Sequence, residues 1–218
     1  MIDLHTHSIF SDGELIPSEL VQRAKVAGYR KIAITDHGDH SNADFIISRM
    51  VKVCMKLSET CAIQVIPGIE LTHVRPEHIF ELTEECRRMG AVIVVVHGET
   101  IVEPVMAGTN MAALQSHIDI LAHPGLITEE EAHLAAANSV FLEISTRRGH
   151  SLTNGHVVKM ARETRASLVL NTDSHAPRDL VGKEMSLKIA AGAGMTEQEI
   201  EIMFQNSESL LERVLHNR

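Results

Sequence analysis

The sequence predicts a closed α/β barrel of seven parallel strands, and three observations lead to this fold. Seven short apolar runs alternate with longer segments of helical spacing. In such an alternation each helical crossover returns to the sheet in the right-handed sense, so the strands are parallel. Each run also ends at a histidine or an acidic residue. A barrel gathers the carboxyl ends of its strands in one ring, whereas an open sheet would leave the outer ends too far apart to form one site.

The expected strands are residues 1–4, 31–35, 62–67, 91–96, 118–122, 139–144 and 167–171. Helix signals lie between them. Pro17 and Pro76 suit the first position of a helix, and Gly28 and Gly90 suit helix ends. The expected N-cap residues are Asn42, Thr128, Thr153 and Thr196. Thr128 and Thr196 are each followed three residues later by a glutamate, Glu131 and Glu199, which predicts two capping boxes.

The length of 218 residues predicts one domain covering residues 1–218, and the composition of 44% hydrophobic and 22% charged residues is that of an ordinary globular protein. Because no apolar run is long enough to span a membrane, we expect no membrane partner. The three cysteines lie away from the polar strand ends, which favours a reduced cytoplasmic protein. A net charge of −9, no Trp and one Tyr disfavour a general nucleic-acid binder. The 14 histidines instead suggest metal or proton chemistry.

The polar strand ends carry the candidate chemistry. A core has no packing reason to place His, Asp or Glu at every strand end, whereas one site with several metal ions accounts for nearly all of them. The ends are Leu4-His5-Thr6-His7, Thr35-Asp36-His37, Gly68-Ile69-Glu70, Val96-His97, Ala122-His123, Leu142-Glu143 and Thr172-Asp173-Ser174-His175.

The first of these ends is a pair of imidazoles. His5 and His7 lie on the same side of an extended strand, because side chains alternate with period two. The turn Ser11-Asp12-Gly13 can return Asp12 to the mouth of the barrel. Imidazoles and carboxylates without a thiolate suit Zn, Mn or Fe.

Together these motifs resemble the polymerase and histidinol phosphatase (PHP) family of metal-dependent phosphoesterases. The resemblance rests on motifs that occur in the family's order from the first strand to the last. They are Asp3-Leu4-His5-Thr6-His7-Ser8, Ser11-Asp12-Gly13, Ile34-Thr35-Asp36-His37, Gly68-Ile69-Glu70, His97, His123 and Asn171-Thr172-Asp173-Ser174-His175. The resemblance implies a distorted seven-stranded (β/α)7 TIM-like barrel.

The resemblance also implies three neighbouring divalent metal ions. The residues that bind these ions would take part in catalysis through them. The first ion would be held by His5, His7, Glu70 and Asp173. Glu70 would also bind a second ion, together with His97 and His123. The third ion would be held by Asp12, His37 and His175. Three divalent ions bring six positive charges and the three acids remove three. The remaining positive charge would favour an anionic phosphate.

Other polar residues near the strand ends have supporting roles in this hypothesis. Glu143 either orients a ligand imidazole or neighbours the basic loop that follows it, and Asp36 is expected in a similar supporting or turn role. Arg147 and Arg148 follow the sixth strand, so they either contact the substrate phosphate or are solvated loop charges. Arg178 is a second candidate for the phosphate.

Residues 98–110 form a long segment after His97, which we expect to be a lid that limits the leaving group, or else a short unrecognised strand or helix. His40 and His73 face either the pocket or the surface, and the role of His150 is left open. The histidines expected not to bind metal are His78, His117, His133, His156 and His216.

The leading hypothesis is a phosphatase in which a metal-bound hydroxide attacks a small phosphate monoester such as histidinol phosphate. A phosphodiesterase or exonuclease acting on nucleotides or oligonucleotide ends is the first alternative. An amidohydrolase is a second, although that class usually has a lysine where His97 stands. A binding module with an inactive site is the last, and the nine filled ligand positions argue against it.

Overall fold

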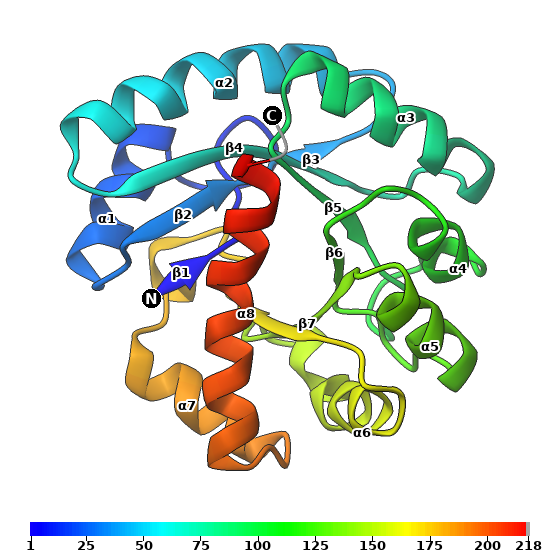
Figure 1. The fold of residues 1–218 in the computed structure, drawn as a ribbon. Helices are drawn as coiled ribbons and strands as arrows, with labels where there is room; N and C mark the ends of the chain where they lie inside the picture. Colours follow the sequence, from blue (N-terminus) through cyan, green and yellow to red (C-terminus); the bar gives the residue numbers. More distant parts are fainter. Residues whose placement is uncertain (217–218) are drawn as a thin grey trace.

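The computed structural model describes residues 1–216, and its parallel strands form a sheet that curls into a nearly closed barrel (Figure 1). The order around the barrel is β1 (Ile2–Asp3), β2 (Lys31–Ile34), β4 (Gln64–Leu71), β5 (Ile93–His97), β6 (Ile120–Ala122), β7 (Phe141–Ser145) and β8 (Leu168–Asn171). A short additional strand, β3 (His37–Gly38), pairs with the carboxyl end of β4. The predicted seven-stranded α/β barrel is confirmed.

Helices follow the strands and lie around the outside of the barrel in Figure 1. They are α1 (Pro17–Val26), α2 (Ala43–Thr60), α3 (Pro76–Met89), α4 (Thr109–Leu114), α5 (Glu129–Ala137), α6 (Asn154–Thr164) and α7 (Lys183–Gly192), with 3-10 turns η1 (His150–Thr153) and η2 (Pro177–Asp179). None of the helices within residues 1–216 combines the length and the apolarity needed to cross a membrane.

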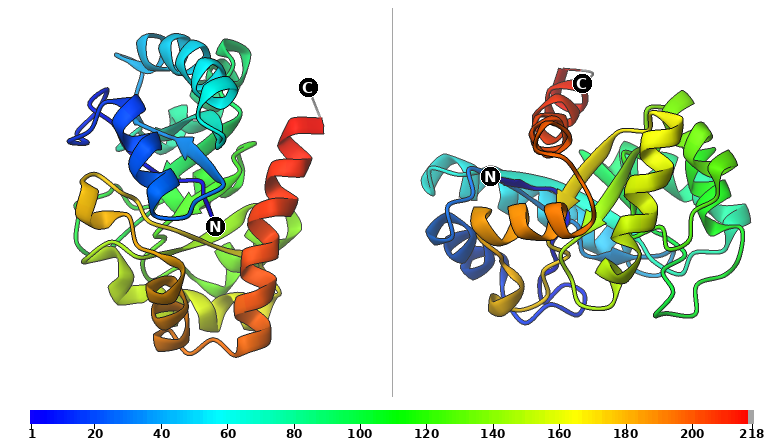
Figure 2. Two further views of the ribbon diagram at one scale, coloured as in Figure 1. Left: turned by 90° about the vertical axis from the view of Figure 1, so that its left-hand side faces the viewer. Right: turned by 90° about the horizontal axis from the view of Figure 1, so that it is seen from below.

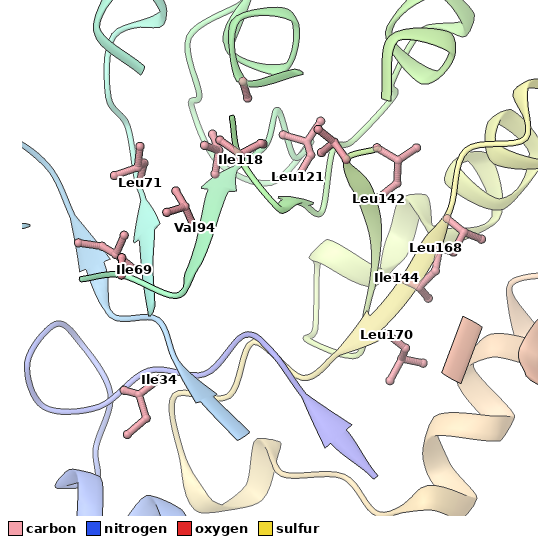
Figure 3. Packing of buried hydrophobic residues seen from close by; sticks show 14 of the residues in the cluster. Ile34, Ile69, Leu71, Val94, Ile118, Leu121, Leu142, Ile144, Leu168 and Leu170 are labelled. Atoms are coloured by element: carbon pink, nitrogen blue, oxygen red, sulfur yellow. The ribbon is translucent and has the colours of Figure 1, made fainter. Parts of the chain in front are cut away.

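The alternation of β5 shows how the barrel separates two apolar layers. Val94 and Val96 belong to the outer cluster between the sheet and the helices, part of which Figure 3 shows. Ile93 and Val95 belong to a second cluster inside the barrel. Because side chains alternate with period two, His97 continues the inward-facing series into the carboxyl half of the barrel. The interior is therefore apolar at one end and polar at the other.

Helix α8 (Glu197–His216) covers the apolar end of the barrel. Its Leu210 and Leu211 are fully buried and pack in the inner cluster with Ile2 and Val169 from the first and last strands. Figure 1 shows α8 crossing in front of β1 and β7, and Figure 2 shows it set apart on one side of the sheet. The carboxyl ends of the strands remain free of this helix and can carry a site.

The barrel closes between β1 and β8, just beyond the ends of these short strands. The backbone N–H of His7 donates to the carbonyl of Ser174 at 2.9 Å, and that of Asp173 donates to the carbonyl of His5 at 3.0 Å. Asn171 adds a side-chain link, because its Oδ1 accepts from the Leu4 N–H at 2.9 Å. Closure thus depends on the segments that contain the first and last expected ligands.

One expected strand boundary changes the place of a site residue. The third strand was expected over residues 62–67, but β4 extends to Leu71, because its outer half pairs with both β3 and β5. Glu70 therefore lies within a strand rather than after one.

The expected helix caps are borne out in part. The capping boxes at Thr128 and Thr196 are confirmed. Asn42 and Thr153 precede helices without capping them. The Asn42 side chain instead donates to the carbonyl of His37, and the Thr153 hydroxyl donates to the carbonyl of His150 within η1.

Candidate metal centre

Imidazole and carboxylate groups converge at the polar end of the barrel. Four sets of donor atoms each lie within 4.8 Å of one another: His5, His7 and Glu70; His5, His123 and Asp173; His97, His123 and His150; and His7, Asp12, His37 and His175. These sets contain all nine ligands expected from the sequence, together with His150. Residues from the first strand to the last are thus brought to one place.

Glu70 is the centre of the cluster. Its side chain is fully buried, and its Oε1 lies 3.3 Å from His5 Nε2 and 3.7 Å from His123 Nε2. Its Oε2 lies 2.5 Å from His37 Nδ1 and 3.7 Å from His7 Nε2. One carboxylate therefore faces four imidazoles from three separate segments, which is the arrangement needed to bridge neighbouring ions.

Asp173 is a second buried carboxylate beside Glu70. Its Oδ1 lies 3.1 Å from His7 Nε2, and its Oδ2 lies 3.7 Å from His123 Nε2. Burial and the nearby charge of Glu70 raise the pKa of Asp173 to about 7. A neighbouring cation would reverse this effect, because it favours the ionised carboxylate.

The backbone at Asp173 and His123 is also unusual. Their φ angles are +49° and +29°, in the left-handed region that residues with a side chain rarely adopt. Such strain costs of the order of 1–3 kcal/mol per residue and clusters at functional sites. Asp173 lies two residues after the end of β8, and His123 lies directly after β6.

The third set, around Asp12, is the most open part of the cluster. Asp12 Oδ1 lies 3.4 Å from His37 Nε2 and 3.1 Å from His175 Nε2. The two imidazoles are 3.3 Å apart at their Nε2 atoms. Because the Asp12 side chain is 58% exposed, this set faces solvent and can meet a substrate.

The buried polar atoms fit divalent metal ions. Several of them have no hydrogen-bond partner among residues 1–216: His5 Nε2, both ring nitrogens of His7, Glu70 Oε1, His123 Nδ1 and Asp173 Oδ1. Leaving such an atom buried and unpaired costs about 1–3 kcal/mol, and metal coordination would satisfy it. Burial also lowers the pKa of His7 and of His123 well below the ordinary value, which keeps one nitrogen of each ring unprotonated and able to bind a cation.

Contacts around the candidate ligands orient them. Glu143 Oε2 lies 2.8 Å from His5 Nδ1 and also accepts from Asn171 Nδ2 at 3.0 Å. Of the two roles considered for Glu143, the geometry matches the one that orients a ligand imidazole. Asp36 accepts from the backbone and hydroxyl of Ser8, each at 2.7 Å, and from the Ser11 hydroxyl at 2.8 Å. Asp36 thus fixes the loop that carries Asp12.

Asp3 is a supporting residue that the sequence reasoning missed. It is buried and accepts from the Thr172 hydroxyl at 2.5 Å and from the Thr172 N–H at 3.2 Å. Burial raises the pKa of Asp3 to about 6. Its position two residues before His5, within the same motif, was the available signal. The contact ties the first ligand segment to the last.

The three candidate arginines line one pocket of about 810 Å³ beside Asp12 and His175. Arg147 lies deepest, since its Nη1 donates to the Asp173 carbonyl at 3.0 Å and also contacts His175 Nδ1. Arg148 lies at the exposed rim. Arg178 is 78% exposed, and its Nη1 is 3.4 Å from Glu14 Oε1. Of these three arginines, Arg147 is therefore the nearest to the candidate metal ligands.

The remaining histidines divide between the site and the surface. His73 stacks on His97 with ring centroids 5.4 Å apart, so it faces the edge of the cluster. His40 instead contacts His78 on the outside of the barrel. The five histidines expected not to bind metal lie outside all four donor sets. His150, whose role the sequence left open, is buried within one of them, and burial lowers its pKa to about 4.

Comparisons with known proteins agree with this arrangement. The sequence model of the PHP domain matches residues 3–146. An uncharacterized protein of Methanocaldococcus jannaschii is 47% identical over 97% of this chain and 99% of its own length. A probable phosphatase of Thermoanaerobacter sp. is 27% identical over 90% of this chain and 88% of its own.

Two further proteins are similar to this chain. Ribonuclease P protein component 3 of Methanosarcina barkeri is 28% identical over 90% of this chain and 82% of its own. A structure of a proposed histidinol phosphatase, HisK, from Listeria monocytogenes superimposes with a TM-score of 0.61 at 13% identity, covering 86% of this chain and 99% of that one. The latter similarity supports the fold.

Proposed function

Because the chain belongs to the PHP domain family, we propose that it is a metal-dependent phosphoesterase that hydrolyses a small phosphate monoester. The observation that carries the proposal is the convergence of buried imidazoles and carboxylates around Glu70, next to a pocket lined by arginines. The probable phosphatase from Thermoanaerobacter supports the same substrate class.

The donor sets suggest how three ions would be held. As the family resemblance implies, the first would be bound by His5, His7, Glu70 and Asp173, the second by Glu70, His97 and His123, and the third by Asp12, His37 and His175. The donor sets support this grouping in part, because the imidazoles of each group fall within one set. When bound, divalent ions supply Lewis acidity at phosphate oxygens and lower the pKa of a coordinated water. None of the cysteines takes part in the four donor sets, so the donors suit Zn, Mn or Fe.

The protein's own side chains would position the substrate. The Arg147 guanidinium is held against Asp173 and His175, where its planar fork can donate two hydrogen bonds to a phosphate. Arg148 would approach the same phosphate from the rim of the pocket. The leaving group would extend along the wall formed by Met185 and Ile189 of α7. A pocket of this size suits a small organic group.

A phosphodiester in a nucleic acid is the second candidate substrate, because ribonuclease P protein component 3 is among the relatives. The net charge of −9 and the single tyrosine weigh against it, since nucleic-acid surfaces are usually basic and rich in stacking residues.

The two candidates are separated by parallel assays with Zn²⁺, Mn²⁺ and Fe²⁺. The substrates are p-nitrophenyl phosphate, histidinol phosphate, bis-p-nitrophenyl phosphate and a short single-stranded RNA. We expect metal-dependent turnover of a monoester. The turnover rate should fall by more than about 100-fold in Glu70→Gln. Glu163→Gln, a change on the exposed face of α6, is the matched control. Turnover of the diester or RNA alone would overturn the monoester proposal.

A further inference from the structure

His150 occupies a place that a surface loop histidine would not. It is the first residue of η1, and only 3% of it is exposed. Its ring stacks on His123 with centroids 4.0 Å apart and an interplanar angle of 16°. Its Nε2 lies 3.7 Å from Asp173 Oδ2. His150 is therefore packed directly against residues of the candidate metal centre.

The two ring nitrogens of His150 face different partners. Nδ1 lies 2.8 Å from the Thr100 hydroxyl, so that nitrogen is already tied. The arrangement matches that of His5, in which Glu143 holds Nδ1 and Nε2 faces the cluster. A hydrogen bond between one ring nitrogen and an oxygen atom fixes the ring, so that the other ring nitrogen faces an ion. The donor nitrogens of His97, His123 and His150 lie within 4.8 Å of one another.

A carboxylate from the loop after β5 completes this group. Glu103 Oε2 lies 3.0 Å from His97 Nε2, and its Oε1 lies 3.4 Å from His150 Nε2. The Glu103 side chain is 38% exposed, while both imidazoles are 3% exposed. A carboxylate thus reaches inward from a surface loop and spans two buried imidazoles.

The loop that carries Glu103 covers residues 98–108, because α4 begins at Thr109. Its base is fixed by reciprocal hydrogen bonds of 2.9 Å, in which Glu99 N–H donates to Asn110 Oδ1 and Asn110 N–H donates to Glu99 Oε1. Asn110 also donates to the Pro124 carbonyl, next to His123. In contrast, Ile101 and Val102 near the tip are about half exposed. Glu103, next to this tip, contacts His97 and His150.

We propose that His150 and Glu103 are additional ligands of the ion position formed by His97 and His123, and that they fasten the 98–108 loop to the metal centre. The imidazoles of His97, His123 and His150 and the carboxylate of Glu103 are a suitable donor set for a divalent ion. Loading this position would then hold the loop over the cluster. The inference rests on the proposed metal-dependent function, and it adds two residues to that centre.

Cobalt titration tests the inference without measuring turnover. Metal-free protein is titrated with Co²⁺ while its visible absorption is recorded, and Zn²⁺ affinity is measured by competition with a chelator. We expect His150→Asn and Glu103→Gln each to change the Co²⁺ spectrum and to weaken one Zn²⁺ site by about 10-fold or more. His133→Asn, at an exposed position of α5, is the matched control.

A second measurement separates ligation from loop packing. Thr100→Val removes the partner of His150 Nδ1 but leaves both proposed donors in place. The form of its Co²⁺ spectrum should therefore stay close to that of the wild type, while its Zn²⁺ affinity falls because the ring is held less firmly. Limited proteolysis of residues 98–108 should slow when Zn²⁺ is added to the wild type, and this protection should be lost in Glu103→Gln. Because Glu103 is partly exposed, this variant does not depend on core stability.

The outcomes distinguish this inference from the proposed function. A wild type that takes up Co²⁺, together with His150→Asn and Glu103→Gln variants of unchanged spectrum and Zn²⁺ affinity, would overturn the inference and leave the phosphoesterase proposal standing. A wild type that binds no divalent ion would overturn both.

Discussion

Glu143 Oε2 lies 2.8 Å from His5 Nδ1, although the two residues are 138 positions apart in the sequence. Both side chains are fully buried, so the contact forms in an environment of low dielectric constant. The carboxylate holds one nitrogen of the imidazole and leaves Nε2 facing Glu70 at 3.3 Å. β7 thereby orients a residue that follows β1.

This contact predicts the effect of Glu143→Gln. We expect metal affinity to fall by about 10- to 100-fold, because orienting partners of ligand imidazoles typically contribute this much. Competition with a chelator measures the affinity, and Glu163→Gln serves as the control. An unchanged metal affinity in Glu143→Gln would show that Glu143 does not orient His5 for metal binding.

The position of Arg147 predicts that a substitution there weakens substrate binding without affecting metal binding. Arg147→Met should lower kcat/KM for the monoester by about 10- to 100-fold, the effect of losing a charged hydrogen bond of about 1.5–3 kcal/mol. Metal content should stay at the wild-type level, because Arg147 offers no ligand atom. The same change at Arg178, which is 78% exposed, should have a smaller effect. Steady-state kinetics and elemental analysis of each variant provide the check, and equal losses at both positions would contradict this assignment.

Helix α8 predicts how the barrel is stabilised. Leu210→Ala should lower the free energy of unfolding by about 2–5 kcal/mol, because Leu210 is fully buried in the cluster inside the barrel. Leu215→Ala, on the same helix but 39% exposed, should change it by less than about 1 kcal/mol. Denaturant unfolding of metal-free protein measures both. Similar losses for the two variants would mean that α8 does not seal the barrel.

The start of α8 predicts an acid-dependent loss of stability. Hydrogen bonds from Arg162, and from the Thr196 N–H, lower the pKa of Glu199 to about 2 from an ordinary value of 4.5. A carboxyl whose pKa is lower in the folded state stabilises the fold above the unfolded pKa. This contribution should be complete above about pH 5 and should fade as the pH falls toward 2.

Glu199→Gln tests this pH dependence. The difference in unfolding free energy between wild type and variant should be largest near pH 7 and should shrink between pH 5 and pH 2. Urea unfolding at fixed ionic strength measures it. A difference that does not vary with pH would show that the Glu199 charge is not responsible.

The sequence could predict the barrel and much of the site, because both follow from strand periodicity. Glu70 lies on the same inward face of β4 as Ile66, and Glu143 lies on the same inward face of β7 as Phe141. Ile66 and Phe141 belong to the apolar cluster inside the barrel. A polar residue that continues an inward-facing apolar series must lie inside the barrel. This is why the polar strand ends indicated one shared site.

Other parts of the site depend on features that periodicity does not encode. His123 and Asp173 reach the cluster through left-handed backbone conformations, which no alternating pattern predicts. Glu103 comes from an irregular loop, whose path is set by contacts such as Glu99 with Asn110. His150 begins the short 3-10 turn η1, which follows no strand periodicity. The end of β4 was also placed too early, because its pairing with the short β3 is a tertiary feature.

Elemental analysis of purified protein loaded with Zn²⁺ or Mn²⁺ is the most direct test of the metal centre, with Glu70→Gln and Glu163→Gln measured in parallel. The account predicts three ions per chain in the wild type and in Glu163→Gln, and a clear reduction in Glu70→Gln, because one buried carboxylate faces four imidazoles. A wild-type protein that retains no divalent ion, or a Glu70→Gln variant that retains all of them, would contradict it.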